Sequence, residues 1–369
     1  MKNKKIIIIF SYYIFIIIII ISNLFINSLI KENKNMLIIR FSISENKTIN
    51  SIYYNILDNN SNHISCEGHP IMARLNNLAW FIGHNKEKNI IGVLYNLSSN
   101  KIIKKSQTFI KGDSLHIAGL LNNSKNNKFY LFANYKNDFS YWISESNFSN
   151  IKFSKNIKID KMGYSYPAVY EYNNSNIWLL YMNNNSEIAR KIFNKNGEKL
   201  ENKEIIYNLN FFPKYISINK LNKEYVIFIE NESINNYDYY LNSSNGKEWN
   251  LQKLEYDKNI KFSDYRFTSF LRKNNLNIVA TTIKDKLNKS HIAIYTGNSL
   301  KNLTFNKLLN HSDGITFSRI YNDLDDKIII TAQIYKKGVY NYKNIINFII
   351  IIIIIISTII FYKILNKNE

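Results

Sequence analysis

A pattern of about fifty residues occurs six times along the chain, and it constrains the fold more than any other feature. Each copy holds a short loop, a strand that begins near a proline or an aromatic residue, a polar turn and a second, strongly apolar strand. Repeats of this length suit the four-stranded blades of a β-propeller. The paired strands are expected at residues 69–82, 115–133, 166–181, 212–229, 266–280 and 316–332.

All three prolines of the chain, Pro70, Pro167 and Pro213, fall at the same place in this repeat. Proline has no N–H for a sheet and is tolerated at the first residue of a strand. The segment 52–57 precedes the first copy, and the sixth copy ends early. An N-terminal strand is therefore expected to complete the last blade, which would close the ring and remove its exposed edges.

These features predict an all-β, six-bladed β-propeller over residues 38–340. The alternative is a set of unrelated antiparallel hairpins, as in a β-sandwich. The chain is 14% aromatic, and disordered segments are poor in aromatic residues, so its abundant Asn and Lys do not indicate disorder. Cys66 is the only cysteine, so the apolar core must hold the domain without an intramolecular disulfide.

Apolar segments lie at both ends of the chain. Residues 1–30 combine a basic start with a run too long for an ordinary signal peptide, which favours a signal-anchor over a cleaved signal peptide. Residues 345–365 carry no charge except Lys363 and predict a transmembrane helix, with 366–369 as a cytosolic tail. A soluble fold has little means of covering a helix that is apolar on every side.

Lysines flank both apolar segments on the outer side, which predicts that both ends lie in the cytosol. The domain between them then belongs to the secretory pathway and faces the lumen or the outside of the plasma membrane or another membrane. Glycosylation sequons agree with this placement, although a chain rich in Asn also forms them by chance. They include Asn46, Asn96, Asn122, Asn147, Asn242, Asn288 and Asn302.

The formal charge of +20 does not predict a nucleic-acid partner, because Lys is spread evenly and not gathered on one stripe. We read the charge mainly as biased composition, with attraction to anionic glycans as the lesser alternative. The sequence shows no metal-ligand cluster, Gly-rich phosphate loop or Ser/His/Asp signature, so neither a metal nor a cofactor is expected.

The fourth copy of the repeat ends in the motif Ser243-x-Asn245-Gly246-x-x-Trp249. Ser and Asn can bond to nearby backbone in a tight turn, Gly can take a positive φ, and Trp can pack under the turn. The motif resembles the Asp-box of sialidases and other BNR-type propellers, with Asn in place of Asp. In that family the Asp-box is structural, so the resemblance concerns the fold and not the activity. Weaker copies occur at 141–148 and 295–305.

The sialidase resemblance implies three arginines that clamp a carboxylate, a Tyr-Glu pair as nucleophile and activator, and an Asp as acid/base. Guanidinium groups suit such a clamp because they pair bidentately with carboxylates. Arg266 is the best match to a clamp residue. Asp113 and Tyr321 are weaker catalytic candidates, and His69 stands where an arginine is expected ahead of Pro70.

His69 and His116, near the starts of first strands, are expected to face the central funnel and to join Arg266 as ligand-binding residues, or to be hydrogen-bonded structural histidines. Arg319 lies inside a first strand and is expected in polar contacts between blades or in solvent. Glu230 follows the second strand of the fourth copy and could pair with a tyrosine, but the sequence favours this pairing no more than chance does.

We therefore predict a membrane-anchored, non-catalytic surface protein that resembles inactive trans-sialidase-like proteins. Its expected partners are the membrane and either sialylated or other anionic glycans or a surface protein. The rival is a glycoside hydrolase, an exo-sialidase or trans-sialidase, with a diverged site that uses Arg266. A purely structural ectodomain is the third alternative.

Overall fold

The computed structural model describes residues 34–335 apart from a set of loop positions, and in this part it holds no helix able to cross a membrane. The predicted segments 1–30, 345–365 and 366–369 lie outside the described residues. The other positions left out are 45–46, 57–69, 86, 113, 124–127, 137, 145–148, 150, 162–166, 173–175, 184–185, 195–197, 212, 222, 232–237, 255–267, 286, 288, 312–313 and 325.

The described strands form six four-stranded sheets, five of which take four strands in chain order. The first two hold β3 (Ile71–Leu75), β4 (Leu78–His84), β5 (Ile90–Asn96) and β6 (Lys101–Ile110), then β7 (Ser114–Asn123), β8 (Lys128–Tyr135), β9 (Asp138–Ser144) and β10 (Phe153–Lys161). The next holds β11 (Ala168–Tyr172), β12 (Asn176–Asn183), β13 (Glu187–Asn194) and β14 (Lys199–Asn208).

The fourth sheet holds β15 (Pro213–Leu221), β16 (Glu224–Asn231), β17 (Asp238–Ser243) and β18 (Asn250–Leu254). The fifth holds β19 (Thr268–Lys273), β20 (Leu276–Lys284), β21 (Ser290–Gly297) and β22 (Thr304–Leu309). The last, called here the closing sheet, joins the two ends of the domain and holds β23 (Ile315–Asn322), β24 (Lys327–Tyr335), β1 (Lys34–Ile43) and β2 (Ile49–Ile56).

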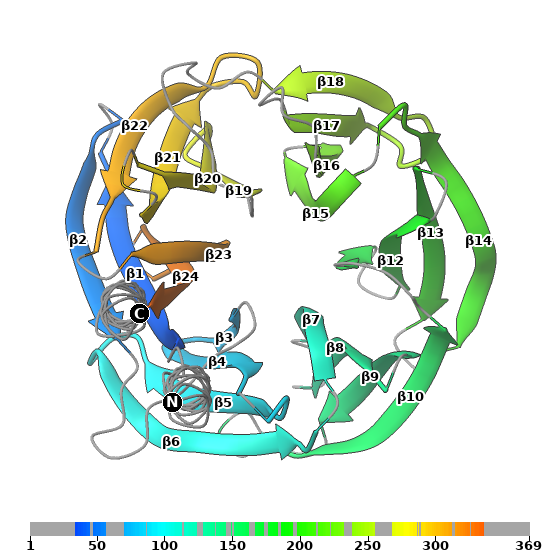
Figure 1. Cartoon of the computed structure of the whole chain (residues 1–369), viewed down its shortest axis with the longest axis horizontal. Coiled ribbons are helices and arrows are strands. Elements are labelled where there is room, and N and C mark those ends of the chain that lie inside the picture. The colour runs from blue at the N-terminus through cyan, green and yellow to red at the C-terminus, as the bar shows by residue number, and fades with distance from the viewer. Residues whose placement is uncertain are drawn as a thin grey trace, which may run out of the picture. The chain divides into compact units, whose positions relative to one another are not determined.

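The first strand of each sheet lies at the centre of a ring, and the fourth lies on the rim (Figure 1). The inner strands contact one another in a closed cycle, β3 to β7, β11, β15, β19, β23 and back to β3. This arrangement confirms the predicted all-β propeller and excludes a β-sandwich. The six predicted strand pairs occupy the two innermost strands of each sheet.

The core of the domain lies between neighbouring sheets. Second strands such as β20 are covered on both faces and are buried along nearly their whole length, which explains their continuous apolar runs. Phe228 of β16 and Phe270 of β19 show how neighbouring sheets meet, with ring centroids 4.4 Å apart. Apolar side chains from two sheets meet in the same way within a mixed cluster around Tyr295 and Leu254.

Two N-terminal strands, and not the single one expected at 52–57, complete the closing sheet. β2 includes most of that predicted segment, while β1 is an additional strand placed between β2 and β24. The side chains of β1 from Asn35 to Phe41 are buried, because β1 lies in the interior of its sheet. Strand order of this kind joins the two ends of the domain into one sheet and leaves the ring without an open seam.

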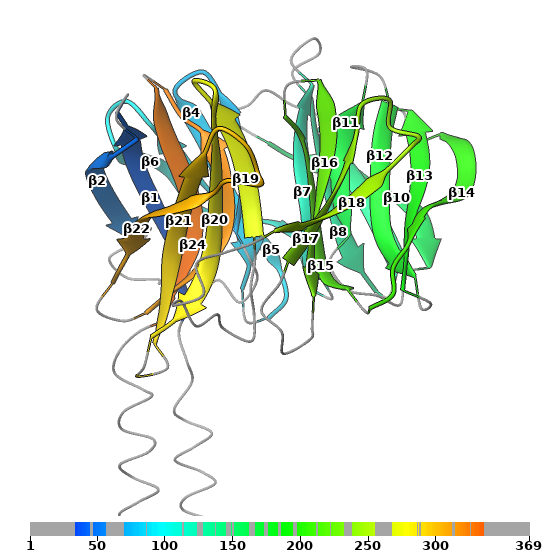
Figure 2. The same ribbon diagram turned by 90° about the horizontal axis from the view of Figure 1, so that it is seen from above.

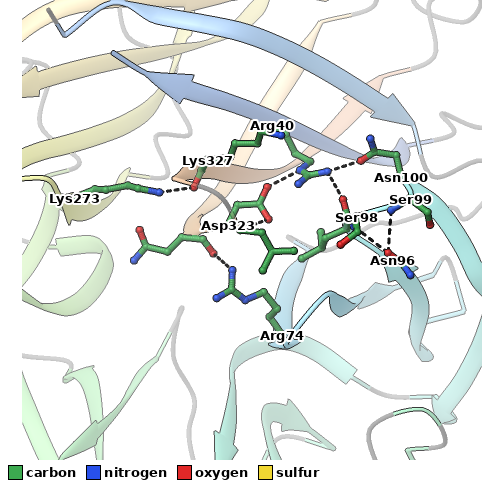
Figure 3. A network of polar contacts seen from close by, with 12 residues as sticks. Arg40, Arg74, Asn96, Ser98, Ser99, Asn100, Lys273, Asp323 and Lys327 are labelled. Atoms are coloured by element: carbon green, nitrogen blue, oxygen red, sulfur yellow. Dashed lines mark hydrogen bonds and ion pairs between the residues drawn. The ribbon is translucent and has the colours of Figure 1, made fainter. Parts of the chain in front are cut away.

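A buried ionic network fixes this closure from the side of β1 (Figure 3). Arg40 Nε donates to Asp323 Oδ2 at 2.5 Å, and the Asp323 side chain has no exposed surface. Arg40 Nη1 also donates to the carbonyl of Leu97 at 2.6 Å and to Asn100 Oδ1, both in the turn between β5 and β6. One guanidinium thus links the N-terminal strand, the C-terminal hairpin and the first sheet.

A five-residue turn recurs between strands. In this turn the first residue donates its N–H to the carbonyl of the fifth residue, and the side-chain oxygen of the first residue accepts the N–H of the fifth. Two examples are Asn85–Asn89 and Asp285–Lys289, in both of which these two hydrogen bonds measure 3.0 and 2.9 Å. The same frame is found at 44–48 and 194–198. The first side chain therefore replaces hydrogen bonds that a tight turn would leave to water.

Acid is expected to loosen the Asp285 turn selectively. The hydrogen bond from His291, at 2.9 Å, and then the Lys289 N–H hold the pKa of Asp285 below the ordinary value of about 3.9. A depressed folded-state pKa stabilises the turn above that value, and the contribution is lost as the pH falls through the folded pKa. Hydrogen–deuterium exchange should show Leu287 and Lys289 losing protection as the pH falls below about 4.

The turn that begins at Asn85 is the matched control, because its amide side chain does not titrate in this range. Protection of Asn89 should persist over the same acid range. Equal loss in both turns would contradict a role for the Asp285 carboxylate.

Candidate functional site

The fourth sheet brings a tyrosine and a carboxylate together near the centre of the ring. Tyr215 of β15 and Glu230 of β16 are direct cross-strand partners, so their side chains share one face of the sheet. Only 6% of Tyr215 and 4% of Glu230 is exposed. Burying two polar groups together is favourable only if they have hydrogen-bond or charge partners, so the pair marks an organised site.

The closing sheet supplies an arginine and a second tyrosine. Arg319 pairs with Thr331 across β23 and β24, and Tyr321 lies two residues further along the same face. The hydroxyl of Tyr321 accepts the N–H of Met72 at 3.0 Å, and Thr331 Oγ1 donates to the carbonyl of Pro70 at 2.7 Å. This face is thereby fixed against the start of β3.

Electrostatic coupling unites these groups into what we call the inner cluster: Tyr215, Glu230, Arg319 and Tyr321. Burial raises the pKa of Tyr215, while the charge of Arg319 lowers it and that of Glu230 raises it. Burial also raises the pKa of Tyr321, against lowering by Arg319 and by the Met72 N–H. The charge of Arg319 thus acts on both phenols.

The cluster holds two phenols, the positive charge of Arg319 and the carboxylate of Glu230. Its phenols are protonated at neutral pH, because a tyrosine pKa is ordinarily about 10 and burial here only raises it. Neutral phenols donate and accept hydrogen bonds, and a guanidinium attracts carboxylate or sulfate groups. The arrangement is suited to holding an acidic, hydroxyl-rich molecule.

Most of the ligand residues predicted from the sequence fall outside what the structure describes. Arg266, His69 and Asp113 belong to undescribed loop positions, and the side chain of His116 is also outside the described set, although its backbone lies in β7. Tyr321 lies in β23 and belongs to the inner cluster. The ligand-binding and catalytic roles of Arg266, His69, His116 and Asp113 stay predictions.

The sequence analysis did not select Tyr215, and it gave Glu230 and Arg319 no functional role. A signal for the first pair existed, since the short turn that joins Leu221 to Glu224 fixes Tyr215 opposite Glu230 by simple counting. The proximity of Arg319 had no such signal, because it depends on how separate sheets are placed around the ring.

The motif Ser243–Trp249 forms a tight turn between β17 and β18. Ser243 Oγ accepts the N–H of Gly246 at 2.8 Å, and Asn245 Oδ1 accepts the N–H groups of Lys247 and Glu248 at 2.8 and 3.0 Å. Gly246 has a φ of 73°, and Trp249 is buried in the core between the third and fourth sheets.

The third sheet holds this turn in place. Arg190 Nη1 donates to the carbonyl of Gly246 at 2.8 Å, and its guanidinium lies 4.4 Å from the ring centre of Trp178. Arg190 also pairs with Glu204 at 2.6 Å. The turn is therefore a contact between sheets, which gives the motif a structural reading.

Comparisons with known proteins establish the fold. No family profile matches the chain. The chain is similar to eukaryotic translation initiation factor 2-alpha kinase 2 of Plasmodium berghei (strain Anka), with 26% identity over an alignment of 267 residues. The alignment covers 68% of this chain but only 9% of that kinase.

Two solved structures are similar in shape. A protein of unknown function from Dyadobacter fermentans DSM 18053 matches with a TM-score of 0.54 and 11% identity, over 73% of this chain and 94% of that one. A polysaccharide lyase, an ulvan lyase of family PL25 bound to -[GlcA(1-4)Rha3S]-, matches with a TM-score of 0.51 and 11% identity, over 74% and 90%. The chain has the β-propeller fold that these structures share.

Proposed function

We propose that this chain is a membrane-anchored propeller that faces the lumen or the outside and binds an acidic glycan without cleaving it. The observation that carries the proposal is the grouping of Arg319 with two tyrosines and Glu230 on the two innermost strands of the fourth sheet and the first strand of the closing sheet. An arginine beside neutral hydroxyl groups matches a sugar that bears a carboxylate or a sulfate. The ulvan lyase similar in fold is described with a bound saccharide of this acidic kind, which supports the ligand class.

Burial favours binding over catalysis within the cluster. A nucleophilic phenol needs access to the sugar and an accessible phenolate, whereas Tyr215 is 6% exposed and has a raised pKa. The Tyr321 hydroxyl already accepts a backbone N–H from Met72. These tyrosines are better placed to support Arg319 than to attack a glycosidic carbon.

We also infer that the six sheets are the blades of one sialidase-type propeller. The support is the turn Ser243–Trp249, which stands between the third and fourth strands of its sheet and has Asn245 in the role of the usual Asp. In this reading the turn is a degenerate Asp-box that holds two blades together.

Arg319→Gln is expected to weaken binding of an acidic glycan about tenfold or more, the loss typical of one charge-assisted contact. The test is titration of the full-length chain in nanodiscs with sialyllactose and with a sulfated glucuronate–rhamnose oligosaccharide. Arg74→Gln is the matched control, because Arg74 lies on the inner strand β3 and donates to the carbonyl of Asn322 at an exposed position. Equal affinities of the Arg319 variant and the unaltered chain would overturn this site.

Hydrolysis separates the binding protein from the enzyme. The full-length chain is expected to release no fluorophore from a fluorogenic sialoside while circular dichroism shows folded β-structure. Turnover that is abolished in Arg266→Ala and in Tyr321→Phe would replace the proposal by a sialidase with a diverged site.

A protein ligand is the second candidate function. The observation behind it is the similarity to part of a much larger kinase. A chain that is folded, ignores every acidic glycan on an array and retains one protein reproducibly from membrane extracts would support this second candidate.

A further inference from the structure

A leucine projects from the tip of the hairpin between β20 and β21. Leu287 is 87% exposed, the highest value among the exposed large apolar side chains that the structure describes. The five-residue turn that carries it is well fixed, since Asp285 Oδ1 accepts the N–H groups of Leu287 and Lys289 at 2.8 and 2.9 Å. The exposed leucine therefore stands on a rigid support.

The turn does not need an apolar residue at this place. The matching turn of the first sheet, which begins at Asn85, has the exposed Glu87 as its third residue. The two other turns of the same frame have Asn46 and Asn196 there. Leucine is the exception among the four turns, so the turn itself does not call for an apolar side chain at this place.

The hairpin tip lies at the end of the ring where the domain continues into the rest of the chain. A Cβ atom on Gly314 would lie 3.6 Å from the Lys289 side chain and 3.7 Å from the carbonyl of Ser290, which places the start of β23 beside the hairpin. Ile315, the first residue of β23, pairs with Ile334, near the end of β24. The end of β24 is thus at the same end of the domain as the tip of the β20–β21 hairpin, and this end is at the bottom of Figure 2.

The first strand begins at this end as well. Arg40, in the second half of β1, bonds to Asp323 just before β24 begins, so β1 runs antiparallel to β24. Lys34 therefore lies near the end of β24. Both the segment 1–33 and the segment 336–369 are joined to the domain at the end that carries Leu287.

We propose that Leu287 inserts into the interfacial region of the lipid bilayer that anchors this protein. The proposal rests on the membrane anchoring put forward above, since the apolar runs 6–30 and 345–365 are joined to the same end of the domain. Lys284 and Lys289 flank the tip, and lysines can place their ammonium groups among lipid phosphates while an apolar neighbour enters the acyl boundary. The partner is the bilayer surface, contacted by the β20–β21 hairpin.

The test measures how deep the tip lies. A nitroxide is attached to Leu287→Cys in the full-length chain, with Cys66→Ser removing the native thiol, and the chain is reconstituted in phosphatidylcholine–phosphatidylserine vesicles. Collision rates with oxygen and with a water-soluble nickel chelate are compared. Lys301→Cys is the control, because Lys301 is exposed in the turn between β21 and β22, at the opposite end of the same sheet.

The label at 287 is expected to favour oxygen over the nickel chelate several-fold more than the label at 301. Equal accessibility at both sites, or shielding of 287 from both reagents as in a protein–protein contact, would overturn the lipid contact and leave the anchoring intact. A chain that fails to float with the vesicles would overturn the anchoring itself, and the inference with it.

Discussion

Replacing Arg40 by leucine is expected to lower the free energy of unfolding by about 3–5 kcal/mol, the usual cost of leaving a buried charge without its partner. Asp323 has no exposed side-chain surface, so its carboxylate would lose the Arg40 contact without gaining water. The carbonyl of Leu97 and the side chain of Asn100 would lose their donor at the same time. The closing sheet would lose its link to the first sheet.

Urea denaturation followed by tryptophan fluorescence measures the effect. The double variant Arg40→Leu with Asp323→Leu should be more stable than the single variant, because no unpaired charge then remains buried. A loss below about 1 kcal/mol in the single variant would mean that water reaches Asp323 and that the ion pair does not hold the closure.

Replacing Gly246 by alanine is expected to cost about 2–5 kcal/mol, from backbone strain and overpacking together. Its φ of 73° is unfavourable for a residue with a side chain, and a Cβ atom would lie 2.5 Å from the Trp178 ring. That ring is held in turn by Arg190, so it has little room to move. Urea denaturation followed by tryptophan fluorescence measures this loss of stability as well.

Gly112 provides the control for strain alone. It has a similar φ of 64°, but a Cβ atom there would meet nothing within 4 Å. Gly112→Ala should therefore cost about 1 kcal/mol, and the difference between the two variants measures the clash with Trp178. Equal costs would show that the turn can move away from the third sheet.

Much of the fold could be predicted because propeller sheets are local in sequence. Each of five sheets takes four strands in order, and a strand such as β20 is marked by an unbroken apolar run between turns. The strand β1 could not be recognised in the same way. The strand β1 lies outside the six copies of the repeat, and its partner β24 is almost three hundred residues away along the chain.

The inner cluster could be predicted only in part. Tyr215 and Glu230 are joined by a hairpin, so their pairing follows from local counting. Arg319 acts on Tyr215 from another sheet, and that relation depends on the number of sheets and on their spacing around the ring. Local sequence patterns carry no information on how the sheets are spaced. The resemblance to sialidases directs attention instead to residues such as Arg266, which match positions of the sialidase site.

The closing sheet also limits the order in which the strands of the domain can fold during synthesis. The ribosome releases β1 and β2 first, but the strand that covers β1 is the last of the domain to emerge, and Arg40 must wait for Asp323, 283 residues later. Until then the apolar strand β1 lacks its neighbour β24, while the five local sheets can form one after another during synthesis. Nearly the whole domain must therefore be synthesised before β1 gains its native neighbour β24, and the apolar side chains of β1 lack that cover for most of the synthesis of the domain.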